Sequence, residues 1–268
     1  MNAVPQAEAF AQPASRLRNL LFQAAYWSTS TVVAILALPM LAWPSRKPLM
    51  AWIRLYSRLM VFWMRAICGV RLEVRGRENL PEGGCIIASK HQSWGDGYCM
   101  FSQFDDLSIV TGDHLEKLPL VGAILRKMQA IVVASCGGAE SRAALMDAEL
   151  HKARSEGRRI LIYPEGRLTP VGHYMPYRKG VFHMYEAYQC PVVPVATNLG
   201  LFWPLDAWRL RPGLAVNAFL EPIPPGLPKA EFMALLHDRI ETGSLALLPD
   251  GFPLPEDREI PHQTSEAA

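Results

Sequence analysis

Residues 85–98 read CIIASKHQSWGDGY, an apolar run followed at once by polar residues and glycines. The apolar residues 85–88 are typical of a short buried strand. After them, His91 and Asp96 stand five positions apart, which is not the spacing of neighbours on a helix. Gly95 and Gly97 allow the backbone to turn. We therefore predict that the two side chains meet in a loop at the carboxyl end of this strand.

The pairing of His91 with Asp96 has a specific chemical meaning. A carboxylate that hydrogen-bonds one ring nitrogen fixes the tautomer and leaves the other nitrogen free to take a proton. The pair is thus typical of a general base. The alternative is a polar loop histidine beside an aspartate that caps a helix over residues 97–104. The pair alone does not decide between them, because short motifs occur by chance.

Further runs of strand length recur along the chain, with helical segments between several of them. The runs lie at residues 72–74, 107–110, 130–133, 159–163, 192–195 and 215–219. Helices are predicted over residues 139–155, 179–188 and 229–247. This alternation indicates an α/β fold with a largely parallel central sheet flanked by helices. Such sheets bind ligands at the carboxyl ends of their strands, where His91 is expected.

A second polar turn follows the strand predicted at residues 159–163. Glu165 and Arg167 flank Gly166, which lets the backbone approach a ligand closely. An arginine in such a turn is well suited to bind a phosphate group with paired hydrogen bonds. The alternative is a surface turn with an incidental Glu–Arg pair.

The amino-terminal part differs in composition. Residues 20–43 carry no charge and are long enough to cross a hydrocarbon core of about 30 Å. Positive residues flank both ends, so charge favours neither orientation: Arg16, Arg18, Arg46 and Lys47. Residues 49–70 place three arginines in one sector of an apolar helix, as in helices that lie in a membrane interface and reach lipid head groups. The alternative is a helix that packs on the soluble domain.

These patterns divide the chain. We predict disordered tails over residues 1–15 and 249–268, a membrane-associated helical anchor over 16–70, and an α/β domain over 71–248. The net charge of +2 without a polybasic block excludes a nucleic-acid binder on charge grounds. Five scattered cysteines without a C-x-x-C pair indicate reduced thiols, and we expect no metal site.

The two polar turns, in this order and about seventy residues apart, resemble the 1-acyl-glycerol-3-phosphate acyltransferase family of membrane-bound glycerolipid acyltransferases. In that family a histidine-x4-aspartate motif precedes a proline-glutamate-glycine motif. The resemblance extends to residues 117–122, 178–180 and 190–195, and covers roughly residues 71–225.

The resemblance implies an enzyme that transfers an acyl chain from a thioester to the free hydroxyl of a lysophospholipid, with lysophosphatidic acid as the expected acceptor. Acyl-coenzyme A or acyl carrier protein would be the donor, and no cofactor is implied. His91 and Asp96 would be catalytic. The acceptor would be bound by residues of the second turn and one later lysine: Glu165, Gly166, Arg167 and Lys179. The resemblance also implies a membrane location with the catalytic domain facing the cytoplasm, as in a bacterial inner membrane.

Two departures from the family pattern concern the acceptor. The family usually reads glutamate-glycine-threonine-arginine, whereas Arg167 follows Gly166 directly. The arginine expected near Ser135 is absent. The family uses both arginines to hold the acceptor phosphate. Lysophosphatidylethanolamine, a non-glycerol lysolipid, or a catalytically silent lipid-binding role therefore stay as alternatives. Hydrolysis is disfavoured because the chain lacks a nucleophile elbow.

Overall fold

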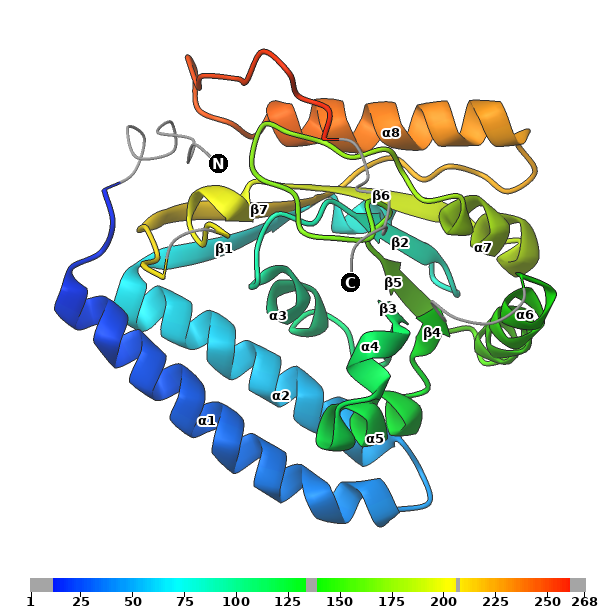
Figure 1. The fold of residues 1–268 in the computed structure, drawn as a ribbon, viewed down its shortest axis with the longest axis horizontal. Coiled ribbons are helices and arrows are strands. Elements are labelled where there is room, and N and C mark those ends of the chain that lie inside the picture. Colours follow the sequence, from blue (N-terminus) through cyan, green and yellow to red (C-terminus); the bar gives the residue numbers. More distant parts are fainter. Residues whose placement is uncertain (1–11, 134–138, 206–207, 261–268) are drawn as a thin grey trace.

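The computed structural model describes residues 12–133, 139–205 and 208–260, with the side chains of α6 from residue 146 onward. Within these residues a central sheet carries helices on both faces (Figure 1). The predicted α/β class with a largely parallel sheet is confirmed.

Seven strands form the sheet in the order β1-β7-β6-β2-β5-β3-β4. Their bounds are Val70–Arg75 (β1), Ile86–Ser89 (β2), Leu107–Gly112 (β3), Ile131–Val133 (β4), Arg159–Ile162 (β5), Val192–Thr197 (β6) and Gly213–Phe219 (β7). Neighbouring strands are parallel except for β6 and β7, which are antiparallel. Each strand corresponds to one of the predicted apolar runs.

Strand β2 occupies the centre of the sheet between β6 and β5. Its register aligns Ala88 with Ile162 of β5 and Ser89 with Val195 of β6. The carboxyl ends of β2 and β5 therefore lie side by side. As a result, the loops that carry His91 and Glu165 leave the sheet at the same edge, where ligands of such sheets bind.

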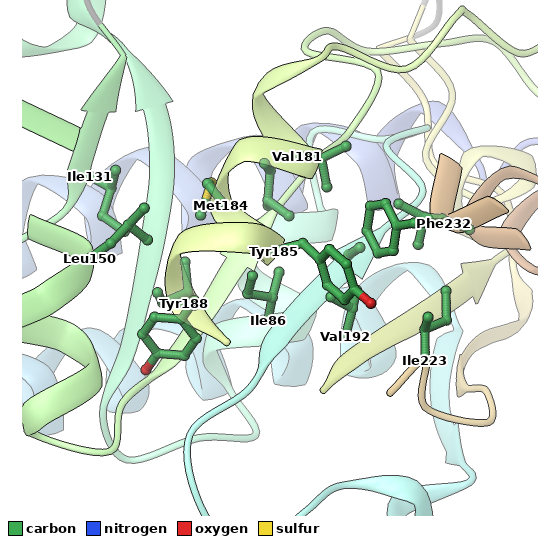
Figure 2. Close-up of a cluster of buried hydrophobic side chains, with 14 of the residues drawn as sticks. Ile86, Ile131, Leu150, Val181, Met184, Tyr185, Tyr188, Val192, Ile223 and Phe232 are labelled. Atoms are coloured by element: carbon green, nitrogen blue, oxygen red, sulfur yellow. The ribbon is translucent and has the colours of Figure 1, made fainter. Parts of the chain in front are cut away.

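Three helices cover one face of the sheet: α6 (Ala139–Ser155), α7 (Gly180–Tyr188) and α8 (Lys229–Leu245). Figure 2 shows Tyr185 of α7 between Val192 of the sheet and Phe232 of α8. The rings of Tyr185 and Phe232 are stacked with their centroids 4.0 Å apart. Burying each such aromatic side chain contributes roughly 1.5–3 kcal/mol, so this cluster fixes α7 and α8 on the sheet.

The opposite face carries α3 (Asp96–Phe101), with α2 (Lys47–Trp63) and α1 (Arg16–Ala42) outside it (Figure 1). Met100 of α3 packs on Ile87, Leu161 and Val193, which point to this face from three central strands. Two helices that the sequence analysis did not predict follow β3: α4 (Asp113–Glu116) and α5 (Pro119–Met128). Three short helical turns complete the fold: Met64–Cys68, Arg77–Asn79 and Leu199–Leu201.

Helices α1 and α2 form a hairpin along this side of the domain (Figure 1). Polar contacts join them, including a hydrogen bond of 2.7 Å between the hydroxyls of Ser30 and Tyr56 and one of 3.0 Å from Trp52 Nε1 to the carbonyl of Val33. By length and composition, α1 is the one helix among the described residues that is able to cross a membrane, and 6% of its apolar window is buried.

Two arginines of the second predicted membrane segment contact the domain, as in the alternative of a helix that packs on it. Arg54 forms an ion pair with Asp105, and Arg58 Nε donates to the carbonyl of Ser102 at 3.3 Å. Both contacts arise because α2 packs on α3 and on the loop after it. Only Arg65, which is exposed, stays free of such a contact among the hydrogen bonds and ion pairs of the described residues.

Parts of both predicted tails have backbone hydrogen bonds to the domain where they are described. Ala14 is buried and its N–H donates to the carbonyl of Leu210 at 2.9 Å. Near the other end, Tyr174 N–H donates to Arg258 O, and Ile260 N–H donates to Tyr174 O, at 2.9 Å each. Residues 258–260 are thus paired with the backbone of Tyr174. Residues 1–11 and 261–268 lie outside the described part of the chain.

Candidate active site

His91, in the loop after β2, meets Asp96, the first residue of α3. His91 Nδ1 lies 2.9 Å from Asp96 Oδ2. The same oxygen accepts the backbone N–H groups of Gln92 at 2.7 Å and Ser93 at 2.9 Å. Asp96 is buried, and no described residue hydrogen-bonds its Oδ1. Asp96 therefore fixes the loop and the imidazole together, instead of capping α3, whose N-cap residue is Gly95.

The imidazole of His91 is held in position from one side. Its ring stacks on Tyr163 with centroids 3.9 Å apart and an interplanar angle of 16°. Burial, and next the charge of Asp96, raise the pKa of Tyr163 well above its ordinary value, so the phenol stays neutral. The His91 side chain is 22% exposed, and no described residue hydrogen-bonds Nε2. Nε2 is thus free to take a proton from a bound hydroxyl.

Glu165 lies behind this pair. Its side chain has no exposed surface, and Oε1 accepts from Lys90 Nζ at 2.6 Å. Oε2 accepts the backbone N–H of His91 at 3.2 Å. The structure therefore brings Glu165 to His91, as a support of the backbone. The carboxylate of Glu165 is thus buried and paired within the protein.

Gly166 and Arg167 lie on the surface beside the catalytic loop. Gly166 has a φ of 74°, the left-handed region that favours glycine. A Cβ at Gly166 would meet the side chain of Arg178, whose Cγ and Nε would lie 3.2 Å away. The N–H of Arg178 donates to Pro164 O at 2.8 Å, which folds the following segment back onto the turn. Arg178 is thus a neighbour of the predicted phosphate-binding turn.

Three exposed cations gather here: Arg167, Arg178 and Lys179. Within the described part of the chain, no carboxylate forms an ion pair with any of them. Lys179 is the N-cap residue of α7, and the positive end of a helix dipole favours an anion. Sequence reasoning noted Arg178 only as part of the family pattern. Its contact with Gly166 depends on the return of the chain, which local spacing does not reveal.

Ser93 does not behave as a nucleophile in this geometry. Its hydroxyl accepts the N–H of Gly95 at 3.1 Å, and no hydrogen bond joins it to His91 in the described residues. The same described residues hold no cluster of three or more His, Cys, Asp or Glu side chains that could bind a metal. The groups assembled at the strand ends are those of proton transfer and anion binding.

Comparisons with known proteins match this region. The family model described as Acyltransferase matches residues 71–198. A 1-acyl-sn-glycerol-3-phosphate acyltransferase of Pseudomonas aeruginosa is 33% identical over 162 residues, which are 59% of this chain and 61% of that protein. The human 1-acyl-sn-glycerol-3-phosphate acyltransferase beta is 28% identical over 172 residues, 63% of this chain and 62% of its own length. The chain thus spans about three fifths of these relatives.

A solved structure gives the fold an independent comparison. The crystal structure of the 1-acyl-sn-glycerophosphate (LPA) acyltransferase from Thermotoga maritima has a TM-score of 0.69 with 20% sequence identity. The match covers 87% of this chain and 97% of that one, so the shared fold includes more than the segment matched by the family model. By the matched segment and the order of its motifs, this chain is similar to the acyltransferase family that includes the 1-acyl-sn-glycerol-3-phosphate acyltransferases.

Proposed function

We propose that this protein is a membrane-bound O-acyltransferase that moves a fatty acyl chain from a thioester to the free hydroxyl of a lysophospholipid, with lysophosphatidic acid as acceptor and phosphatidic acid as product. The observation that carries the proposal is the hydrogen bond of 2.9 Å between His91 Nδ1 and Asp96 Oδ2, with Nε2 left free at the end of a central strand. The relatives carry names of this activity.

In the proposed reaction, Nε2 of His91 takes the proton of the acceptor hydroxyl as its oxygen attacks the thioester carbonyl. A C–O bond forms, the C–S bond breaks, and the departing thiolate receives the proton from the imidazolium. Asp96 keeps Nδ1 protonated and stabilises the imidazolium charge. A positioned base of this kind contributes about 10²–10⁴ in rate. No covalent intermediate on the protein is needed, in keeping with the position of Ser93.

The acceptor phosphate is proposed to bind to Arg167 and Lys179, with Arg178 as a third cation and with the exposed backbone of Gly166 in contact. The grouping of these exposed cations beside the loop of His91 supports this assignment. The arginine pair supplies the planar donors suited to phosphate oxygens. Glu165, which was first expected to touch the acceptor, is proposed to support the turn and the His91 backbone instead.

The helical hairpin is proposed to place the site at a membrane. Large apolar side chains on α1 are exposed, among them Trp27 at 65% and Ile35 at 58%. Because α1 lies along α2 on the domain, entry into one leaflet fits its packing better than a perpendicular span. The catalytic domain is proposed to face the cytoplasm of a bacterial inner membrane, where both acyl donors are made.

The test is an acyl-transfer assay with the purified full-length protein in detergent. Acyl-coenzyme A and acyl carrier protein donors are offered with lysophosphatidic acid, with lysophosphatidylethanolamine, and with a lysolipid that lacks glycerol. Formation of phosphatidic acid supports the proposal. Transfer to another acceptor corrects the substrate. Release of free fatty acid alone indicates hydrolysis, and an absence of turnover with every pair indicates a silent lipid-binding protein.

A further inference from the structure

Three buried charged side chains lie behind the loop of His91: Lys90, Glu165 and Glu241. The proposed mechanism uses only the contact of Glu165 with the His91 backbone. The three side chains are 1%, 0% and 8% exposed. Lys90 Nζ donates to Glu165 Oε1 at 2.6 Å and lies 2.9 Å from each carboxylate oxygen of Glu241. It also donates to the carbonyl of His173 at 2.9 Å. The ammonium group is therefore surrounded by acceptors.

This cluster joins the loop of His91 to distant parts of the chain. Glu165 Oε2 accepts the N–H of His91, so one carboxylate contacts both Lys90 and the backbone of the catalytic histidine. Glu241 belongs to α8 and lies 151 positions after Lys90. Tyr177 donates its hydroxyl hydrogen to Glu241 Oε1 at 2.8 Å. A continuous series of hydrogen bonds thus runs from the carboxyl-terminal helix to the catalytic loop.

Stability alone does not account for such a cluster. Moving an ion into a protein interior costs several kcal/mol, and apolar replacements of buried ion pairs are often neutral or stabilising. Here two carboxylates share one ammonium group. Burial raises the pKa of Glu165, the charge of Lys90 lowers it in part, and the charge of Glu241 raises it further. Hydrogen bonds between buried charges fix the orientation of the groups that they join, which apolar contacts do not. Sites need such fixed support around a reacting group.

We propose that Lys90, Glu165 and Glu241 are positioning residues that hold the His91 loop in its reactive place, with Glu241 acting on His91 only through Lys90 and Glu165. This inference rests on the proposed acyl transfer. Among the described residues, neither Glu165 nor Glu241 forms an ion pair with the exposed cations at which the acceptor phosphate is proposed to bind. Loss of the network therefore lowers kcat and leaves KM for the lysolipid near its original value.

The test compares Glu241→Leu with Glu241→Gln in the full-length enzyme. Leucine removes the two Glu241 oxygens that accept from Lys90. We expect kcat to fall by about tenfold or more, since small displacements of catalytic groups cost up to about 10². Glutamine keeps an acceptor oxygen and is expected to recover most of kcat. Asp238→Leu is the matched control, because Asp238 is exposed on the same helix and its variant is expected to keep the original kcat.

A double variant tests the route of the effect. Because Glu241 acts through Lys90, Lys90→Met with Glu241→Leu is expected to have the kcat of Lys90→Met alone. Amide hydrogen exchange gives a readout without activity: the N–H of His91, which is donated to Glu165, is expected to exchange faster in Glu241→Leu and at the original rate in Asp238→Leu. If Lys90→Met does not fold, the kcat values of the two Glu241 variants still test whether the cluster positions His91.

Three results would overturn the inference: a full kcat in Glu241→Leu, a loss that glutamine does not recover, or effects that multiply in the double variant. A lower Tm with unchanged kcat per folded molecule assigns the cluster to stability alone and overturns it too. If the original enzyme transfers no acyl group to any acceptor, the proposed function fails. The exchange rate of the His91 amide then still decides whether the network positions this loop.

Discussion

At the level of single residues, one oxygen atom has an unusually large share of the contacts. Asp96 Oδ2 accepts three N–H groups, from the ring of His91 and from the backbones of Gln92 and Ser93. The backbone bonds set the direction of the carboxylate before the imidazole binds it. Orientation of His91 therefore depends on the loop itself and does not require the ring to be buried.

Asp96→Asn is expected to reduce kcat by about 10²–10⁴, because the amide carries no charge to stabilise the imidazolium and its nitrogen cannot accept the Nδ1 proton. KM for the acceptor is expected to change little. Steady-state kinetics and thermal unfolding of the same preparation check this. Equal kcat in the variant and the original protein would exclude Asp96 from the reaction.

Ser93→Ala is expected to keep activity on the order of that of the original protein. The substitution removes the hydrogen bond of the hydroxyl to Gly95, worth about 1 kcal/mol of stability, and retains the backbone N–H that Asp96 accepts. Acyl-transfer rates measure the outcome. A loss as large as that of Asp96→Asn, or an acyl group trapped on Ser93, would favour a covalent route.

Arg178→Gln is expected to raise KM for a phosphate-bearing lysolipid by about tenfold with kcat nearly unchanged, since loss of one charged hydrogen bond weakens binding by about 1.5–3 kcal/mol before compensation by Arg167 and Lys179. Arg75→Gln, on the edge strand β1 and paired with Glu73, is the control. An unchanged KM would remove Arg178 from the acceptor site.

The sequence predicted those residues of the site whose partners are near in the chain. His91 and Asp96 stand close together in the sequence, so their meeting follows from local turn chemistry. The contact of Lys90 with Glu241 joins residues 151 positions apart, and no local pattern reports it. The family resemblance implies that Glu165 contacts the acceptor. Its burial against Lys90 depends on the fold around the motif, which the motif alone does not describe.

At the level of elements, the helical hairpin is fastened to the domain at its turn. Arg46, between α1 and α2, donates to Asp106 at 2.8 Å and pairs with Glu156 at 2.5 Å. Arg158 donates to the other oxygen of Asp106 at 2.7 Å. These charges join the hairpin to the amino ends of β3 and β5. Docking of the hairpin thus involves an ion network at the opposite ends of the strands from the loop of His91.

Stability is expected to fall in acid partly through Asp106. Burial by itself raises the pKa of Asp106. The hydrogen bond of Arg46 and the charge of Arg158 outweigh this effect and hold that pKa below its ordinary value. The contribution of ionised Asp106 to the free energy of unfolding is therefore complete above its unfolded-state pKa. It is lost as the pH falls through the lower folded-state pKa. Denaturant unfolding from neutral pH down to about pH 3 measures it. Asp106→Asn should have a flatter acid dependence, and an identical slope would contradict this role.

Substitution of Trp27 and Ile35 by glutamate is expected to release the protein from membranes without unfolding it. Both side chains are exposed on α1, and a charged group in the hydrocarbon region costs about 2.5–3.5 kcal/mol. Sedimentation with phospholipid vesicles measures binding. Trp208→Glu is the control, since that tryptophan is exposed outside the hairpin. Undiminished sedimentation of the double variant would contradict membrane entry by α1.

The elements themselves were largely predictable, because strand length and helix length separate the apolar runs clearly. Helix α5 was not predicted, since its apolar residues and Gly122 do not distinguish a helix from a strand. The proline-rich residues 249–260 are part of a predicted disordered tail. The backbones of Arg258 and Ile260 pair with Tyr174 in the loop before α7, a long-range contact that composition does not report.

At the level of the whole molecule, the order of the strands places the site. Because β2 lies between β5 and β6, its loop is flanked by the loop after β5 and supported from α8. The sequence indicated a parallel sheet but contained no signal for this order, which is set by long-range pairing. The hairpin and α3 then lie on one face, so the proposed membrane contact and the catalytic loop belong to one side of the sheet (Figure 1).

The most direct test of the proposed catalysis is acyl transfer to lysophosphatidic acid by the full-length protein beside its His91→Ala variant, in detergent, with both thioester donors. The original protein is expected to form phosphatidic acid, and His91→Ala is expected to lower kcat by about 10²–10⁴ while its Tm stays close to the original value. Full transfer activity in a folded His91→Ala protein would contradict the proposed catalysis.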